Sequence, residues 1–430
     1  MLDIRFIREN SDLVQQNARN KGYDVNIDEL LRQDETRRTL SLQADVLREK
    51  RNTISSQMKG GRPSDDLIAQ GKAIKDELAV VETSLRDVEE IYTTLIKHVP
   101  NIAASDVPFG VSEDENVVAK TVGVPTTFEF TPKNHAQIAE AKGWIDKERA
   151  SKVAGSRFAY IKGDLVRLEW AMMQWAMNQL CDEVVLKSII EKAGLKVSSK
   201  PFIPVLPPLM IKTELYDAMD RLEPRDDRYK IEGEELWLQG SAEHVLGSMH
   251  ADEILNYDDL PVRYVGYATS FRKEAGTYGK DMEGIIRMHQ FDKMEMESLA
   301  SPETSLDEHL LMVAIQEHLM SSLGLPYQVI LKCTADIGKP NARGVDIDVW
   351  LPGQGQYRET HTADYMTDYQ ARRLKTRFRS EDGIELVHTN DATVLSQRPL
   401  IAIIENYQTV EGDVRVPDVL QPYFAGRLFL

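Results

Sequence analysis

The sequence predicts an α+β fold, in which an antiparallel sheet flanked by helices follows an antiparallel helical coiled-coil arm. Between about residues 30 and 99, apolar residues recur at spacings of three and four, the period of paired helices. From about residue 120, short β-type runs are mostly joined by short turns, which favours antiparallel strands. We therefore divide the chain into an N-terminal arm with its linker, residues 1–118, and a body, residues 119–430.

The composition is that of an ordinary globular protein. The 430 residues are 42% hydrophobic and 28% charged, enough for a large core. There is no apolar run of about 18 residues, and charge begins at Asp3, so we expect a cytoplasmic protein without a membrane span or secretory signal. The two cysteines, Cys181 and Cys333, have no metal-ligand spacing and are expected to be core residues.

The arm is predicted from two heptad patterns separated by a glycine- and proline-containing turn. Arg51 interrupts the first pattern, and Ser64 is a suitable N-cap for the second helix. The first pattern comprises Leu40, Ala44, Leu47, Arg51, Ile54 and Met58, and the second Ile74, Leu78, Val81, Leu85, Val88, Tyr92, Leu95 and Val99. So narrow an apolar stripe cannot pack broadly onto a globular body, so we expect the arm to project towards a partner.

The arm carries local positive charge on a chain whose formal net charge is -17. The basic residues are Arg37, Arg38, Arg48, Lys50 and Arg51 on the first leg, with Lys59 and Arg62 at the tip. The net charge argues against nucleic-acid binding across the whole surface, but not at such a patch. RNA-backbone binding, oligomerisation and a simple solvated spacer all remain open from the arm alone.

In the body, the stretch FRKEAGTYGKDMEGIIRMHQFDKMEM joins two predicted strands through a glycine-bearing loop. Residues two apart in a strand share a face. Arg272 and Glu274 are therefore expected on one face of the first strand, and Phe291, Lys293 and Glu295 on one face of the second. If the strands form a hairpin, this face can stack a purine, neutralise phosphate and hold an amine. A solvated or cross-paired strand face would also fit the pattern.

Two later stretches add charged groups. QYRETHTADYM places Glu359 in an extended run, and HTNDATVLSQRPLIAIIENYQ places Arg398 before an apolar helical run. The chain has neither a P-loop pattern nor a GxGxxG motif after a strand. If the protein binds ATP, it does so on an antiparallel sheet.

These stretches resemble the signature motifs of class II aminoacyl-tRNA synthetases, and nearly the whole chain is similar to the seryl-tRNA synthetase family. The strand ending at Pro207-Pro208 resembles motif 1, the stretch with Arg272 motif 2, and the Arg398 region with ENYQ and VRVPDVLQPY motif 3. MLDIRFIREN, the arm, PNI, DVPFG and GSRFAYIKGDLVRLE extend the resemblance. Single motifs are degenerate, but the ordered set with the arm is specific.

The resemblance implies a class II synthetase-type sheet and an ATP site. Arg272 would contact the α-phosphate, Glu274 the adenine side, and Phe291 the purine face. Arg398 would hold the γ-phosphate and cover the adenine. Glu359, with Thr362 three residues later, would bind Mg²⁺, so Arg272, Glu359 and Arg398 are the implied catalytic residues.

The resemblance also implies a serine site. Glu295 would face serine, and Ser241-Ala242-Glu243 corresponds to a Thr-x-Glu loop near the serine amine. Thr393, supported by Asn390, is the candidate for the serine hydroxyl. The enzyme would form seryl-adenylate and transfer serine to tRNA(Ser), with the arm binding the tRNA and the motif 1 region forming a homodimer.

The sequence departs from the family pattern around the amino acid. The usual Ser-Ser-Cys-Ser-Asn is replaced by Thr360 to Tyr365, and the segment Asn390 to Thr393 before Arg398 is altered and one residue shorter. His361 fits either a substrate contact or a hydrogen-bonded packing residue.

An active seryl-tRNA synthetase is favoured because the implied ATP contacts are present. The alternative is a synthetase-like paralogue with altered specificity, or without activation and binding only RNA or a second subunit. The complete arm disfavours an amino-acid ligase acting on a carrier protein, and the lack of nearby cysteines disfavours the zinc-dependent variant.

Overall fold

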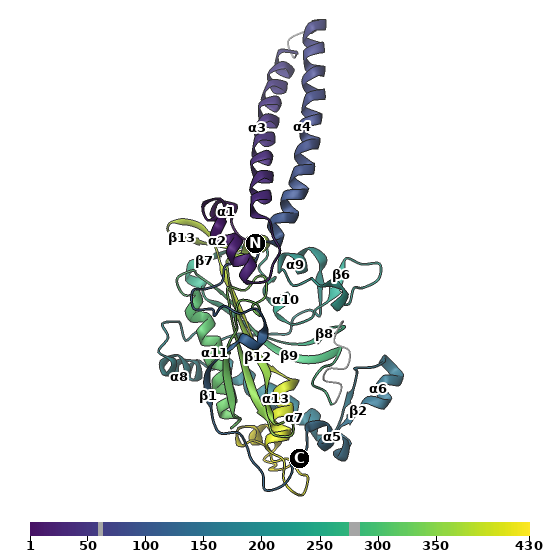
Figure 1. Cartoon of the computed structure of the whole chain (residues 1–430), viewed down its shortest axis with the longest axis vertical. Helices are drawn as coiled ribbons and strands as arrows, with labels where there is room; N and C mark the ends of the chain where they lie inside the picture. Colours follow the sequence, from purple (N-terminus) through teal and green to yellow (C-terminus); the bar gives the residue numbers. More distant parts are fainter. Residues whose placement is uncertain (59–62, 275–283) are drawn as a thin grey trace. The chain divides into compact units, whose positions relative to one another are not determined.

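A computed structural model describes residues 1–58, 63–274 and 284–430. The chain forms two compact units, Met1–Ile102 and Ala103–Leu430, each of which is described by itself below (Figure 1). The basic tip residues Lys59 and Arg62, and the loop between Glu274 and Gly284, lie outside the described residues.

The first unit is helical, and its two long helices form the predicted arm. It consists of α1 (Ile4–Glu9), α2 (Ser11–Asn20), α3 (Ile27–Gln57) and α4 (Asp65–His98). Figure 1 shows α3 and α4 side by side. Ala44, Leu47 and Leu78 are buried between them, and Arg51 is exposed. The hydroxyl of Ser64 accepts a hydrogen bond from the backbone N–H of Leu67, so the predicted N-cap is confirmed.

The second unit is built on an eight-stranded sheet in the order β1-β10-β11-β12-β15-β9-β8-β4. These strands are β1 (Val117–Val122), β4 (Ile203–Val205), β8 (Val262–Phe271), β9 (Gln290–Ala300), β10 (Tyr327–Leu331), β11 (Arg343–Leu351), β12 (Gln356–Thr367) and β15 (His388–Ser396). All neighbours are antiparallel except β4 and β8. The predicted antiparallel α+β fold is therefore confirmed, with one parallel pair that the long connection between β4 and β8 permits.

Helices cover this sheet and close the core. The helices are α5 (His135–Lys142), α6 (Lys147–Ala154), α7 (Asp164–Leu180), α8 (Glu183–Ala193), α9 (Thr213–Ala218), α10 (Glu243–Leu246), α11 (Ser305–Ser322), α12 (Tyr369–Leu374) and α13 (Gln397–Asn406). α11 packs against β12 and β15, and α13 packs against β11. The main apolar cluster draws on α7, α8, α11, α13 and the central strands. No described helix is long and apolar enough to cross a bilayer.

Smaller strands lie outside the main sheet. They are β2 (Ile145–Asp146) with β3 (Tyr160–Ile161), β5 (Met210–Lys212) with β6 (Leu236–Leu238), and β7 (Ile254–Asn256) with β13 (Arg377–Ser380) and β14 (Gly383–Leu386).

Two strands of the main sheet escaped the sequence analysis. β15 occupies the segment before Arg398, where only the following helix was expected. Both faces of β15 are buried, and polar residues such as Asn390 and Asp391 lie on it. The strand therefore lacks the alternation of apolar and polar residues by which a half-exposed strand is recognised. β1 begins at Val117, within the acidic segment interpreted as a linker, and pairs at the sheet edge with β10.

Glu169 of α7 is a buried carboxyl with an expected effect on stability. Burial and the nearby charge of Asp292 raise its pKa to about 7, although Gln397 opposes the shift. Between about pH 4.5 and 7 the folded state therefore holds a proton on Glu169 that the unfolded state has lost, and the contribution of this group to stability falls as pH rises through this window.

We expect Glu169→Gln to remove this loss. The free energy of unfolding of the variant should rise relative to wild type by at most about 1.4 kcal/mol per pH unit between pH 4.5 and 7. Urea unfolding at several pH values measures this difference. Parallel pH profiles for the two proteins would contradict the raised pKa.

Candidate active site

The β8–β9 hairpin brings the predicted charged face together. Ser270 lies opposite Phe291, and the backbone N–H of Arg272 continues the ladder by donating to the carbonyl oxygen of His289 at 2.9 Å. The guanidinium carbon of Arg272 then lies 5.4 Å from the centroid of the Phe291 ring. The hairpin expected from the sequence is confirmed, and it carries a cation beside an aromatic face.

A tight turn before α10 fixes the Arg272 side chain. Its Nε donates to the carbonyl oxygen of Gly240 at 2.9 Å. A Cβ at position 240 would lie 3.2 Å from both His244 Cε1 and Tyr216 Oη, closer than most side-chain contacts. The backbone N–H of Gly240 lies 3.2 Å from the same Tyr216 hydroxyl. Glycine therefore allows the close packing that holds the arginine in place.

This face opens into a cavity of about 790 Å³. The predicted residues among its lining are Arg272, Glu274, Phe291, Glu359, Arg398, Glu243, Glu295, Thr393 and Thr362. The residues come from β8, β9, β12, β15, α10 and α13 and their immediate continuations, so segments far apart in the chain converge on one site. Ser241 and Asn390 are the predicted residues that are not among this lining.

Glu359 and Arg398 form a pair on one side of the cavity. Arg398 Nη1 lies 3.1 Å from Glu359 Oε1 and donates to the backbone carbonyl oxygen of Glu359 at 2.8 Å. A bulge at Thr360 inserts an extra residue into β12 opposite β11, so Thr362 reaches the cavity although it is three residues from Glu359. The Thr362 hydroxyl donates to Asp346.

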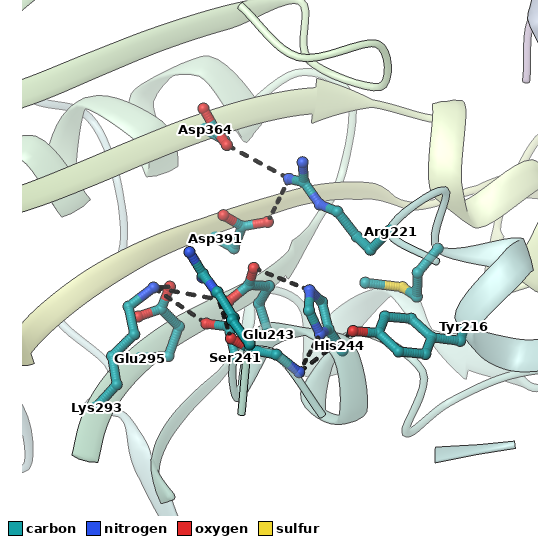
Figure 2. Close-up of polar contacts among 12 residues, drawn as sticks. Tyr216, Arg221, Ser241, Glu243, His244, Lys293, Glu295, Asp364 and Asp391 are labelled. Carbon is teal, nitrogen blue, oxygen red and sulfur yellow. Dashed lines mark hydrogen bonds and ion pairs between the residues drawn. The ribbon is translucent and has the colours of Figure 1, made fainter. Parts of the chain in front are cut away.

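The ammonium group of Lys293 lies among Ser241, Glu243 and Glu295, the residues predicted to bind the serine amine. Its Nζ lies 2.7 Å from Glu295 Oε1, 3.0 Å from Ser241 Oγ and 3.9 Å from Glu243 Oε2 (Figure 2). Ser241 is fully buried and contacts Lys293 instead of lining the cavity. Oε2 of Glu243 and of Glu295 are both buried without a hydrogen-bond donor in the part of the chain that is described.

The charges of this group depend on one another. Burial raises the pKa of Glu295 well above its usual range despite the nearby Lys293. Burial would also raise the pKa of Glu243, but Lys293 and His244 hold it well below its usual value. One lysine thus serves two carboxyl groups, and a second ammonium from a ligand would satisfy the acceptors that remain.

A second charged group lies on the cavity wall, and the sequence analysis did not identify it. Arg221, which follows α9, forms ion pairs with Asp364 of β12 and Asp391 of β15 (Figure 2). All three residues line the cavity. Asp391 is two residues from Thr393, so recognition of β15 as a strand would have placed the Asp391 carboxyl group on the same face as Thr393. Arg221 carried no sequence signal.

The same alternation corrects the prediction that Asn390 supports Thr393 at the serine hydroxyl. On β15, Asp391 and Thr393 face the cavity, and Asn390 faces away from it. The Asn390 amide donates to the carbonyl oxygen of Ser305 at 3.2 Å, where α11 covers the sheet. Because neighbouring strand residues point to opposite faces, Asn390 cannot accompany Thr393 at a ligand in this arrangement.

His361 points away from the cavity. It is 1% exposed, and its ring nitrogens lie 2.7 Å from Thr360 Oγ1 and 3.1 Å from the carbonyl oxygen of Val394. Burial lowers its pKa to about 3, so the ring is neutral. Of the two interpretations left open by the sequence, the hydrogen-bonded packing residue is the one that the contacts support.

The described residues include no cluster of three or more His, Cys, Asp or Glu side chains suited to a metal ion. Glu359, whose side chain is half exposed, and the Thr362 hydroxyl are the oxygen groups at the predicted position. A single carboxylate with a hydroxyl fits Mg²⁺ carried by a phosphate ligand, since Mg²⁺ commonly keeps substrate and water oxygens as its other ligands.

Two family models match the chain. The seryl-tRNA synthetase N-terminal domain matches residues 1–103, and the tRNA synthetase class II core domain (G, H, P, S and T) matches residues 228–407. A serine–tRNA ligase from Thermodesulfovibrio yellowstonii is 38% identical over 434 residues, which cover 98% of each chain. The chain belongs to the seryl-tRNA synthetase family.

Solved structures of this family are similar over the whole chain. The seryl-tRNA synthetase from Pyrococcus horikoshii complexed with ATP superposes with a TM-score of 0.88 at 36% identity, covering 100% of this chain and 99% of that one. The cytoplasmic serine–tRNA ligase from Naegleria fowleri in complex with AMP gives 0.84 at 28% identity, covering 100% and 98%. The class II sheet and the helical arm expected from the resemblance are confirmed.

We expect His361→Gln to affect stability rather than the cavity. Loss of its buried hydrogen bonds should lower the free energy of unfolding by about 1–3 kcal/mol. Denaturant unfolding measures this cost. Unchanged stability together with weaker ligand binding would instead make His361 a ligand contact.

Proposed function

We propose that this chain is an ATP-dependent serine–tRNA ligase that forms seryl-adenylate and transfers serine to tRNA(Ser). The observation that carries the proposal is one cavity that combines Arg272 beside Phe291, Arg398 beside Glu359, and buried carboxylates around Lys293. Family membership supports the reaction class, and the geometry supports the role proposed for each group. Because tRNA is charged in the cytoplasm, we propose that compartment as its location.

The nucleotide binds at the hairpin end of the cavity. Phe291 stacks on the adenine, and Arg272 neutralises the α-phosphate from beside the same ring. Glu274 contacts the adenine side, where its carboxylate already pairs with Arg287 at 3.0 Å. Arg398 holds the γ-phosphate. Binding of ATP would exchange its contact with Glu359 for phosphate oxygens.

Glu359 and Thr362 hold Mg²⁺ together with the ATP phosphates. When bound, Mg²⁺ neutralises negative charge on the phosphate oxygens during attack on the α-phosphorus. Because Thr362 donates its hydroxyl hydrogen to Asp346, its oxygen lone pairs remain available to a cation.

The amino acid binds beside Lys293. Glu243 and Glu295 each have a buried oxygen without a donor among the residues that the structure describes, and the α-ammonium of serine would provide donors for both. This places the amine near β9 and leaves the serine carboxylate directed towards Arg272. Thr393, opposite Glu295 in the sheet register, remains a candidate contact to the substrate.

Activation requires alignment and charge neutralisation but no general base. A carboxylate oxygen of serine forms a bond to the α-phosphorus, and pyrophosphate leaves with the electrons of the broken phosphorus–oxygen bond. Arg272 and Arg398 stabilise the charge on phosphate. In the second step, a ribose hydroxyl of the terminal tRNA adenosine attacks the seryl carbonyl carbon and AMP leaves.

We further propose that the arm, within the N-terminal region 1–118, binds the tRNA, and that the catalytic region 119–430 forms a homodimer. Three of the predicted basic residues, Arg37, Arg38 and Arg48, form ion pairs within the arm. Lys50 and Arg51 are exposed and have no ion pair with any residue that the structure describes, which suits them to phosphate.

Exposed Ile203, Leu206 and Met210 around the motif 1 strand support a subunit interface, which sedimentation equilibrium would measure.

The test is amino-acid-dependent exchange of pyrophosphate into ATP without tRNA, with serine, threonine, alanine, glycine and cysteine in parallel. Exchange with serine alone supports the proposal. Exchange with another amino acid would keep the enzyme class and change the substrate. A folded protein that binds ATP but exchanges with none of the five would overturn it.

Phe291→Ala should weaken nucleotide binding. Loss of base stacking is worth about 1–3 kcal/mol, so the KM for ATP in the exchange assay should rise roughly 5- to 100-fold, with the KM for serine little changed. Phe291→Tyr keeps the ring and serves as the control. An equal rise in both KM values would indicate a collapsed site rather than a lost stack.

Reversal of charge at Lys50 and Arg51 to Glu should leave exchange intact and raise the KM for tRNA in aminoacylation. Fewer phosphate contacts also mean a shallower dependence of tRNA binding on salt concentration. Lys72→Glu with Lys75→Glu, exposed on α4, is the matched control. If the control pair has the larger effect, the tRNA uses the other helix.

A further inference from the structure

The wall that carries Arg221 contains charge that the proposed mechanism does not use. Arg221 Nη2 lies 3.3 Å from Asp391 Oδ2 and 3.4 Å from Asp364 Oδ2 (Figure 2). It also lies 3.4 Å from Asn341 Oδ1. Its side chain is 17% exposed, and those of Asp364 and Asp391 are 9% and 5% exposed. One guanidinium nitrogen therefore joins two buried carboxyl groups.

Burial of these two carboxyl groups beside one another costs folding stability. Asp364 and Asp391 lie directly opposite one another in the β12–β15 ladder, where like charges destabilise a sheet. Burial of a charged cluster is often no better for stability than burial of apolar side chains. Arg221 offsets the repulsion, but one arginine cannot satisfy every oxygen.

Arg221 contacts one oxygen of each carboxyl group, Oδ2 of Asp364 and Oδ2 of Asp391. Oδ1 of Asp364 is buried and lacks a donor among the described residues. Asp391 lines the cavity. It lies two residues before Thr393 on the cavity side of β15, and Thr393 is opposite Glu295. A group attached to the Cβ of an amino acid whose amine is held by Glu243 and Glu295 would therefore meet this strand.

We propose that the carboxyl group of Asp391 hydrogen-bonds the side-chain hydroxyl of serine, and that Arg221 is the positioning residue that holds Asp391 in place. The inference rests on the proposed function and identifies the group that reads the substrate side chain. Alanine and glycine lack the hydroxyl and would leave a buried carboxyl without its partner, which is how such sites reject them.

The electrostatics of the wall agree with a hydrogen-bonding role. Burial raises the pKa of Asp391 to about 8, although Arg221 opposes the shift and Glu243 and Asp364 add to it. The other charged groups that face this position are Lys293 and Glu297 on β9. A carboxyl group in this environment can donate to or accept from a hydroxyl, whereas the side chain of Asn390 is on the other face of the strand.

The test uses the full-length protein in the serine-dependent exchange assay. Asp391→Asn is nearly isosteric, and Asp391→Ala removes the group. Either should lower kcat/KM for serine, about 10- to 100-fold for Asp391→Ala, with the KM for ATP unchanged. Exchange with alanine should not fall, because alanine never makes the contact. Asp226→Asn, which removes one exposed negative charge from the lining of the same cavity, is the control for general electrostatic effects.

Arg221 is tested through coupling. Arg221→Met should raise the KM for serine with little effect on the KM for ATP, and Arg221→Lys should restore part of the loss by keeping the charge. The double variant Arg221→Met/Asp391→Ala should be no worse than Asp391→Ala alone. Thermal unfolding checks that each variant is folded, and the Asp391→Asn result decides the proposal if Arg221→Met is not.

The outcomes separate the two levels of inference. A wild-type protein without serine exchange overturns the proposed function and this inference with it. Wild-type exchange that survives Asp391→Asn and Asp391→Ala, but falls in Thr393→Val, overturns only the inference and assigns the hydroxyl contact to Thr393. An equal loss of serine and alanine exchange in the Asp391 variants would also overturn it.

Discussion

The register between β9 and its two neighbours is the constraint on which the site depends. Glu295 lies opposite Gly266 of β8 on one side and Thr393 of β15 on the other. Because side chains alternate between the two faces of a sheet, this pairing also determines which residues of the neighbouring strands reach the cavity. A slip of one residue would send Phe291, Lys293 and Glu295 into the core and bring apolar methionines to the ligand.

Local irregularities adjust this alternation where the chemistry needs it. The bulge at Thr360 allows both Glu359 and Thr362 to reach the cavity, while His361 turns into the core and bonds Thr360 and the backbone of β15. A second shift, between Thr393 and Leu395, lies just before α13 and Arg398. Such bulges re-aim single side chains without breaking the sheet.

The cavity is also organised by a shortage of cations. Lys293 contacts two carboxylates, and Arg221 contacts two more on the facing wall. Among the described residues, Glu243, Glu295 and Asp364 each keep a buried oxygen without a donor, and the proposed substrate brings donors as an ammonium and a hydroxyl. Unpaired buried acceptors cost stability in the empty protein, and this cost becomes selectivity when only the right ligand removes it.

The sequence by itself determined the parts that depend on local periodicity and spacing. The heptads of α3 and α4, the β8–β9 hairpin with Arg272 and Phe291, and the helix after Arg398 follow from patterns within a few residues. Only the tertiary structure decided the facing of Asn390 and Asp391, the role of His361, and the approach of Arg221 to two distant strands. These depend on register, on a bulge and on contacts across more than 140 residues of chain, which no local pattern encodes because the partners meet only when the sheet has formed.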